Sequence, residues 1–187
     1  DLRQAKRAPR DGTAQVNPEQ QARQEIDRLL GLAGWAVQSI EAANLHAARG
    51  VAIREFALNA GFGFADYLLY VDGKACGVVE AKKQGATLTG VEVQSARYAQ
   101  GLPASLPAWQ RPLPFLYEST GVETHFTQGL DPSPRARHVF AFHKPELLAD
   151  VACVALNRLP PRYIRHEVDF AFYLSETERG ESERHLF

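Results

Sequence analysis

Two periodicities of apolar residues alternate along the chain. In residues 17–34 the apolar side chains recur at helical spacing, with Asn17 as a candidate N-cap, Pro18 at the first helical position, and Gly31 and Gly34 at the end. Shorter apolar or alternating runs further along the chain predict strands. A helix followed by strands, a second helix and more strands predicts an α/β fold with a central mixed sheet flanked by helices.

The remaining elements follow from the same patterns. Residues 35–40 suit a linker or a short strand, and Asp72-Gly73 is a turn signal between two strand-like runs. Thr89 is a candidate cap and Gly101 a candidate end for the second helix. We predict strands at 50–58, 64–71, 74–82, 115–120 and 138–145, a linker at 123–137, and helices at 89–102 and 145–159.

Composition narrows the class of protein. The 187 residues are 45% hydrophobic and 23% charged, as in a globular domain with its own core. The net charge of −1 indicates no overall positive field that would attract nucleic acid, although a local basic patch would be enough for binding. No run is long enough to span a membrane and no signal peptide opens the chain, so we expect a cytoplasmic protein with Cys76 and Cys153 as buried thiols. Because the chain begins at Asp1 and contains no Met, we interpret it as a fragment.

Three charged residues lie in the otherwise apolar hairpin at residues 64–85: Asp66, Glu80 and Lys82. A two-residue loop at Asp72-Gly73 pairs Val71 with Lys74 and places Asp66 and Glu80 on opposite faces. A three-residue loop pairs Tyr70 with Lys74 and places them on one face. The turn sequence permits either loop, and the chemistry requires the second. The alternative to a site is a solvated ion pair on an edge strand.

On one face, the three side chains would suit metal-assisted hydrolysis. Two adjacent carboxylates repel each other when both are ionised, and a divalent cation removes that penalty. Mg²⁺ takes oxygen ligands and uses one or two protein carboxylates. It stabilises charge on a phosphodiester and lowers the pKa of a bound water. Lys82 could orient or deprotonate that water, or neutralise charge in the transition state.

The order Asp66, hairpin, Glu80-Ala81-Lys82 resembles the PD-(D/E)xK nuclease superfamily, with Ala65 in place of the Pro that names it. Gln94 and Tyr98 resemble the Q-x-x-x-Y motif of the RecB-like branch. The strings "REFAL", "GFADYLLYVDGKACGVVEAKKQG", "VQSARYAQGL", "LPFLYESTG" and "PRARHVFAFHKPE" are similar to the N-terminal nuclease domain of the restriction (motor) subunit of type I restriction-modification enzymes.

This resemblance implies a restriction-endonuclease-like fold and an Mg²⁺-dependent endonuclease that cuts double-stranded DNA, with Mn²⁺ as a substitute metal. It makes Asp66, Glu80 and the Ala81 carbonyl metal ligands and Lys82 the catalytic lysine, and it implies partner methylation and specificity subunits. ATP would act only through a motor domain outside this chain, because no phosphate-binding loop occurs here. The implied boundaries are a flexible lead-in at 1–16, the nuclease domain at 17–148, and a helical or linker segment at 149–187.

Three further residues are weaker candidates for the site. Glu25 and Glu55 could add carboxylates near the metal, although a surface position explains Glu25 and an edge strand explains Glu55. Arg137 could contact phosphate. A stand-alone repair nuclease and a non-catalytic DNA-binding or assembly module of the same fold are the alternative functions. The strings after residue 112 argue against the first, and the intact Asp66, Glu80 and Lys82 argue against the second.

Overall fold

The structure, a computed structural model, describes residues 17–88 and 92–156. The chain divides into two compact units, residues 1–150 and 151–187, and all the predicted site residues lie in the first. The predicted lead-in at 1–16, the cap at Thr89 and most of the segment at 149–187 lie outside the described residues.

A seven-stranded mixed sheet, with its strands in the order β1 to β7, forms the centre of the first unit. Neighbouring strands are antiparallel except for β1 with β2 and β4 with β5, which are parallel. The α/β class and the mixed sheet flanked by helices are therefore confirmed. The strands are β1 (Trp35–Gln38), β2 (Gly50–Ala57), β3 (Phe64–Val71), β4 (Lys74–Ala81), β5 (Phe115–Ser119), β6 (Thr124–Gln128) and β7 (Arg137–Val139).

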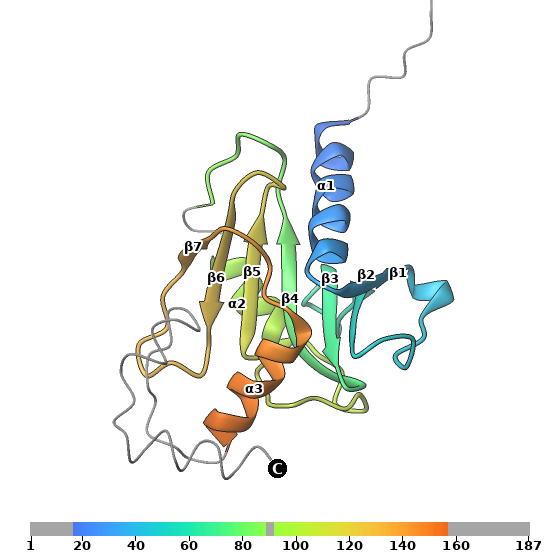
Figure 1. The fold of residues 1–187 in the computed structure, drawn as a ribbon, viewed down its shortest axis with the longest axis vertical. Helices are drawn as coiled ribbons and strands as arrows, with labels where there is room; N and C mark the ends of the chain where they lie inside the picture. Colours follow the sequence, from blue (N-terminus) through green and yellow to red (C-terminus); the bar gives the residue numbers. More distant parts are fainter. Residues whose placement is uncertain (1–16, 89–91, 157–187) are drawn as a thin grey trace, which may run out of the picture. The chain divides into compact units, whose positions relative to one another are not determined.

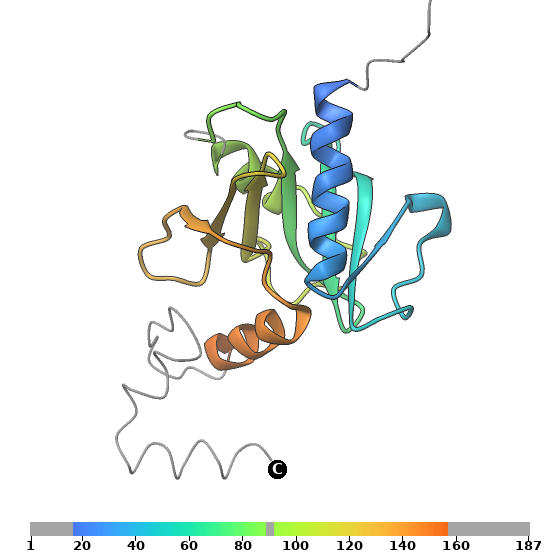
Figure 2. The same cartoon turned by 45° about the horizontal axis from the view of Figure 1, so that its top comes forward.

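Helices α1 (Pro18–Leu32) and α2 (Glu92–Gln100) cover opposite faces of this sheet (Figures 1 and 2). Adjacent residues of β3 show the division, because successive side chains of a strand point to opposite faces. The Tyr67 hydroxyl contacts α1, whereas Leu68 packs in a core cluster with Ala99 of α2. The remaining helical elements are the 3₁₀ turn η1 (Ile40–Ala42) and α3 (Pro145–Leu156).

Local signals located the first two helices. The Asn17 side chain accepts a hydrogen bond from the backbone N–H of Glu19, and Gly34 follows the helix with a φ of 92°, which suits glycine. Gly101 follows the last turn of α2 and donates its N–H to the Tyr98 carbonyl.

Three expectations were wrong. The predicted linker contains β6, which forms a strand because it pairs with β5 along its whole length. The strand predicted at 138–145 is only the short β7 at 137–139. Cys153 is exposed, because an apolar run on a helix need not bury every face, whereas Cys76 is buried.

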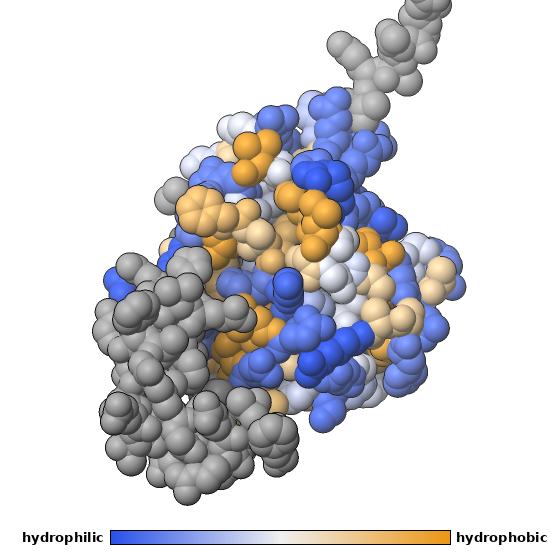
Figure 3. Space-filling view, in the orientation of Figure 1, coloured by the Kyte–Doolittle hydropathy of each residue, from blue (hydrophilic) through white to orange (hydrophobic). Residues whose placement is uncertain are grey.

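The surface of the described residues mixes polar and apolar side chains. The four most exposed large apolar residues in this part of the chain are Leu32, Phe64, Val122 and Phe140. On the face drawn in Figure 3, hydrophobic residues form separate patches among hydrophilic ones. No helix within the described ranges is both long and apolar enough to cross a membrane.

Candidate functional site

The β3–β4 hairpin combines a two-residue turn with a β-bulge. Val71 pairs with Lys74, and both turn residues, Asp72 and Gly73, have positive φ, as a type I′ turn requires. The register then shifts, because Tyr70 pairs with Ala75 but Leu69 pairs with Gly77.

Cys76 is thus the extra residue of the bulge, and its thiol contacts the Leu69 carbonyl at 3.4 Å. Beyond the bulge, Tyr67 pairs with Val79, and the next residues along each strand, Asp66 and Glu80, come opposite each other. The prediction that only a three-residue loop could place them on one face was wrong. The bulge adds one residue to β4 after a two-residue turn, and this extra residue brings Asp66 and Glu80 onto the same face.

Asp66 is held at the point where β3 and β4 stop pairing. Its Oδ2 atom accepts a hydrogen bond of 2.8 Å from the backbone N–H of Ala81, in place of a ladder hydrogen bond. β4 meanwhile stays paired with β5, because the Lys82 N–H donates to the Ser119 carbonyl at 2.8 Å. Pairing with β5 therefore holds the end of β4 on one side of the strand. On its other side, the Asp66 side chain holds the same strand at the Ala81 backbone N–H.

Glu80 is a buried carboxylate, with only 4% of its surface exposed. Its Oε1 atom accepts a hydrogen bond of 2.7 Å from Lys82 Nζ, and its Oε2 atom is buried without a hydrogen-bond partner among residues 17–88 and 92–156. Burial raises the pKa of Glu80 to about 7; Lys82 opposes this rise and the neighbouring Asp66 carboxylate adds to it.

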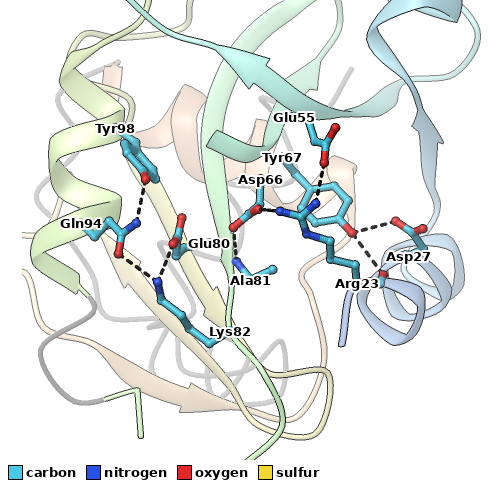
Figure 4. Close-up of polar contacts among 10 residues, drawn as sticks. All are labelled: Arg23, Asp27, Glu55, Asp66, Tyr67, Glu80, Ala81, Lys82, Gln94 and Tyr98. Carbon is cyan, nitrogen blue, oxygen red and sulfur yellow. Dashed lines mark hydrogen bonds and ion pairs between the residues drawn. The ribbon is translucent and has the colours of Figure 1, made fainter. Parts of the chain in front are cut away.

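Lys82, Gln94 and Tyr98 form a hydrogen-bonded chain that extends from Glu80 to α2 (Figure 4). Lys82 Nζ donates to Gln94 Oε1 at 3.0 Å, and Gln94 Nε2 donates to the Tyr98 hydroxyl at 2.7 Å. The i, i+4 spacing places Gln94 and Tyr98 on one face of α2. The structure thus brings together five residues that the sequence analysis selected: Asp66, Glu80, Lys82, Gln94 and Tyr98.

Arg23 of α1 also reaches this site, and the sequence analysis did not select it. Its guanidinium contacts Asp66 Oδ1 through Nη2 and Glu55 Oε1 through Nη1, both at 2.5 Å. Glu55 has a positive φ of 51° and lies on the part of β2 beyond its pairing with β1, which ends at Ile53. The edge-strand interpretation of Glu55 was wrong, because β2 lies between β1 and β3 in the sheet. Arg23 links Glu55 to Asp66.

A second buried carboxylate, Glu118 of β5, lies directly beside Glu80 in the register of the parallel strands. It is 1% exposed, and the hydroxyl of Ser95, a fully buried residue of α2, donates a hydrogen bond to it. Because Ser95 follows Gln94, this bond anchors α2 next to the Lys82 chain. A glutamate inside the apolar run "FLYES" was the signal that could have indicated it.

Two weaker candidates lie apart from these contacts. Glu25 forms an ion pair of 2.5 Å with Arg28 on α1, which agrees with the surface interpretation. Arg137 forms an ion pair of 3.3 Å with Asp131.

The chemistry of the donors fits a divalent cation with oxygen ligands. Among the described residues, no group of three or more His, Cys, Asp and Glu side chains could hold a metal, so an all-side-chain cage is absent from this part. Asp66 and Glu80 provide two carboxylates, as many as Mg²⁺ commonly takes from a protein. The buried Oε2 atom of Glu80 is an acceptor for which the described residues provide no donor.

Two protein-family models match parts of the chain. Residues 37–128 match the family model of the type I restriction enzyme EcoKI endonuclease subunit second domain. Residues 120–186 match the model of the late competence development protein ComFB. No curated protein matches the chain.

A solved fragment structure ascribed to the HsdR subunit of a type I restriction enzyme from Vibrio vulnificus YJ016 has a similar fold. The TM-score is 0.55 at 19% sequence identity, and the match covers 78% of this chain. The chain spans only 27% of the length of that relative.

The mixed sheet, its two flanking helices and the hairpin site define a restriction-endonuclease-like α/β domain. Within that class, residues 37–128 match a domain model of the endonuclease subunit of type I restriction enzymes, the family that the motifs of the chain resemble.

Proposed function

We propose that this chain contributes an Mg²⁺-dependent endonuclease domain that hydrolyses DNA phosphodiester bonds. The observation that carries the proposal is the convergence of Asp66, Glu80 and Lys82 at the end of the hairpin, where a buried Glu80 oxygen has no hydrogen-bond partner in the part of the chain that the structure describes. The family relationship supports a restriction-related nuclease role for the domain.

Each residue has a role that follows from its position. Asp66, Glu80 and the backbone carbonyl of Ala81 would hold Mg²⁺, with Mn²⁺ as a substitute. When bound, the metal supplies Lewis acidity toward a phosphodiester and toward water. Lys82, at the end of β4, orients or deprotonates the attacking water or neutralises charge on the phosphate.

The side chains of Gln94 and Tyr98 on α2 hold Lys82 in position. The Gln94 oxygen accepts from Lys82 Nζ, and the Tyr98 hydroxyl accepts from the Gln94 amide, so the amide can present only its oxygen to Lys82. The lysine is therefore held between Glu80 and Gln94. Gln94 and Tyr98 would orient the site in this way, or would contact the DNA backbone near it.

The domain would work within a larger assembly. The HsdR fragment from Vibrio vulnificus belongs to a type I restriction enzyme, and this chain covers about a quarter of it. We propose that methylation and specificity subunits supply sequence recognition, and that ATP acts through a motor domain not contained in this chain. Cleavage by the domain alone would then have little sequence preference.

Plasmid nicking tests the proposal. Supercoiled DNA would be incubated with the parent chain, Lys82→Ala, Asp66→Asn and the control Lys83→Ala, in Mg²⁺ or Mn²⁺. Lys83 is exposed and adjacent to the site, so its loss changes the charge without removing a site contact. We expect Lys82→Ala to lower the rate by about 100-fold or more, Asp66→Asn to abolish nicking, and Lys83→Ala to retain it.

If the parent shows no nicking, Mg²⁺ calorimetry decides whether the site exists. Heat of Mg²⁺ binding that disappears in Asp66→Ala would indicate a nuclease that depends on its motor. Nicking that survives Lys82→Ala unchanged, or Mg²⁺ binding that survives Asp66→Ala unchanged, would refute the proposed site.

A further inference from the structure

A positive charge of the chain already occupies the carboxylate that the proposed metal site depends on. Arg23 Nη2 lies 2.5 Å from Asp66 Oδ1, and the Ala81 N–H donates to Asp66 Oδ2 at 2.8 Å. Both oxygens of Asp66 are therefore engaged. The other end of the same guanidinium contacts Glu55, so Arg23 bridges two carboxylates from neighbouring strands.

The scaffold holds Arg23 in this place through a separate network. The Tyr67 hydroxyl donates to the carboxylate of Asp27 at 2.8 Å and lies 3.2 Å from the Arg23 carbonyl. Arg54 binds the same Asp27 carboxylate with Nε and Nη2, at 3.0 and 2.7 Å. This clamp fixes α1 against β2 and β3 without using the Arg23 guanidinium, which is free to change partners while its backbone stays in position.

We propose that Arg23 is the resident counter-cation of Asp66, that it competes with the divalent cation for this carboxylate, and that Glu55 retains the guanidinium after the exchange. The inference rests on the proposed metal site. It assigns to Arg23 and Glu55 the control of how readily that site is loaded.

Electrostatics and exposure favour an exchange over shared occupancy. A guanidinium and a divalent cation on one carboxylate repel each other at contact distance. The Asp66 side chain is 14% exposed, whereas that of Glu55 is 67% exposed. When the metal binds, Arg23 therefore loses its ion pair with the more buried Asp66. It keeps its ion pair with Glu55 at the surface, where solvent weakens charge interactions.

Calorimetric titration of the full chain with Mg²⁺ alone tests the competition without any measurement of cleavage. The variants are Arg23→Ala, Arg23→Lys and the control Arg28→Ala, which removes the same charge from α1 at an ion pair with Glu25. We expect Arg23→Ala to bind Mg²⁺ about 5- to 30-fold more tightly than the parent. Arg23→Lys should lie between them, because a single ammonium cannot span two carboxylates as a guanidinium does. Arg28→Ala should bind like the parent.

A double-mutant cycle tests the part assigned to Glu55. Glu55→Gln removes the carboxylate that receives the guanidinium, so it should weaken Mg²⁺ binding several-fold in the parent. In the Arg23→Ala background the same change should have little effect, because the two residues act through each other. Thermal unfolding in a chelator verifies that each variant is folded.

The outcomes separate this inference from the proposed function. Unchanged or weaker Mg²⁺ binding in Arg23→Ala, with binding still abolished by Asp66→Asn, overturns the competition and leaves the metal site standing. Equal effects of Glu55→Gln in both backgrounds overturn the role of Glu55. Mg²⁺ binding that is insensitive to Asp66→Asn, or absent from the parent and every variant, overturns both the metal site and the competition.

Discussion

At the scale of single residues, the site depends on a carboxylate whose ionisation the fold opposes. Burial raises the pKa of Glu80 to about 7 from an ordinary value of 4.5. Between these two values the folded chain holds a proton that the unfolded chain releases. Stability therefore falls as pH rises through this window, and the full destabilising effect is present above pH 7.

Replacing Glu80 by glutamine should remove this dependence, since a neutral amide keeps a similar shape and can still accept a hydrogen bond from Lys82. In a chelator, we expect the difference in unfolding free energy between Glu80→Gln and the parent to grow by about 1–3 kcal/mol, in favour of the variant, as pH rises from 5 to 8. Urea unfolding at both pH values measures the gain, with the exposed Glu146→Gln as the control. A difference from the parent that is the same at pH 5 and pH 8 would contradict the buried-charge explanation.

The sequence identified some residues of the site and missed others for a physical reason. Glu80 and Lys82 are two positions apart on one strand, so their common face follows from strand geometry alone. Arg23 and Asp66 are 43 positions apart, and their contact depends on how α1 packs across the sheet. A helical arginine has no local signal that distinguishes this position from a solvated one.

At the scale of secondary structure elements, local patterns gave the helices and the hairpin but not the register or every strand. The turn at Asp72-Gly73 was recognised from the sequence. However, the bulge at Cys76 shifts the register of β3 against β4 by one residue, and this shift decides which side chains share a face. A bulge can correct either loop, so turn residues alone could not decide which face carries Asp66. β6 was missed because its residues form a strand only through the partner that β5 provides.

The contact between α2 and β5 gives a prediction at this scale. Ser95 is fully buried and donates its hydroxyl hydrogen bond to the buried carboxylate of Glu118. Ser95→Ala removes that donor and should lower the free energy of unfolding by about 1–3 kcal/mol. Ser105→Ala, at an exposed position, should change it by less than about 0.5 kcal/mol. Urea unfolding of the two variants makes the comparison, and a Ser95→Ala effect as small as that of the control would remove Glu118 as an anchor of α2.

At the scale of the whole molecule, the balance of charge limits how the domain can hold DNA. The chain has 21 basic and 22 acidic residues. Net charge is therefore close to zero, and several arginines are already paired with carboxylates within the fold, which lowers the number of cations available for phosphates. The committed arginines of the described residues are Arg23, Arg28, Arg49, Arg54 and Arg137.

We therefore expect the isolated chain to bind duplex DNA weakly and to neutralise only one or two phosphates. With a slope of about −0.9 per phosphate, affinity should fall by about 3- to 12-fold between 50 and 200 mM salt, against about 10³-fold or more for six contacts. Fluorescence anisotropy of a labelled duplex measures the slope, with Ca²⁺ in place of Mg²⁺ to limit cleavage. Lys82→Ala should reduce the slope if the lysine meets a phosphate, and a slope that corresponds to six or more phosphates would show that the chain carries a DNA-binding surface beyond the hairpin site. A shallow slope would instead assign most of the DNA affinity to the other parts of the proposed assembly.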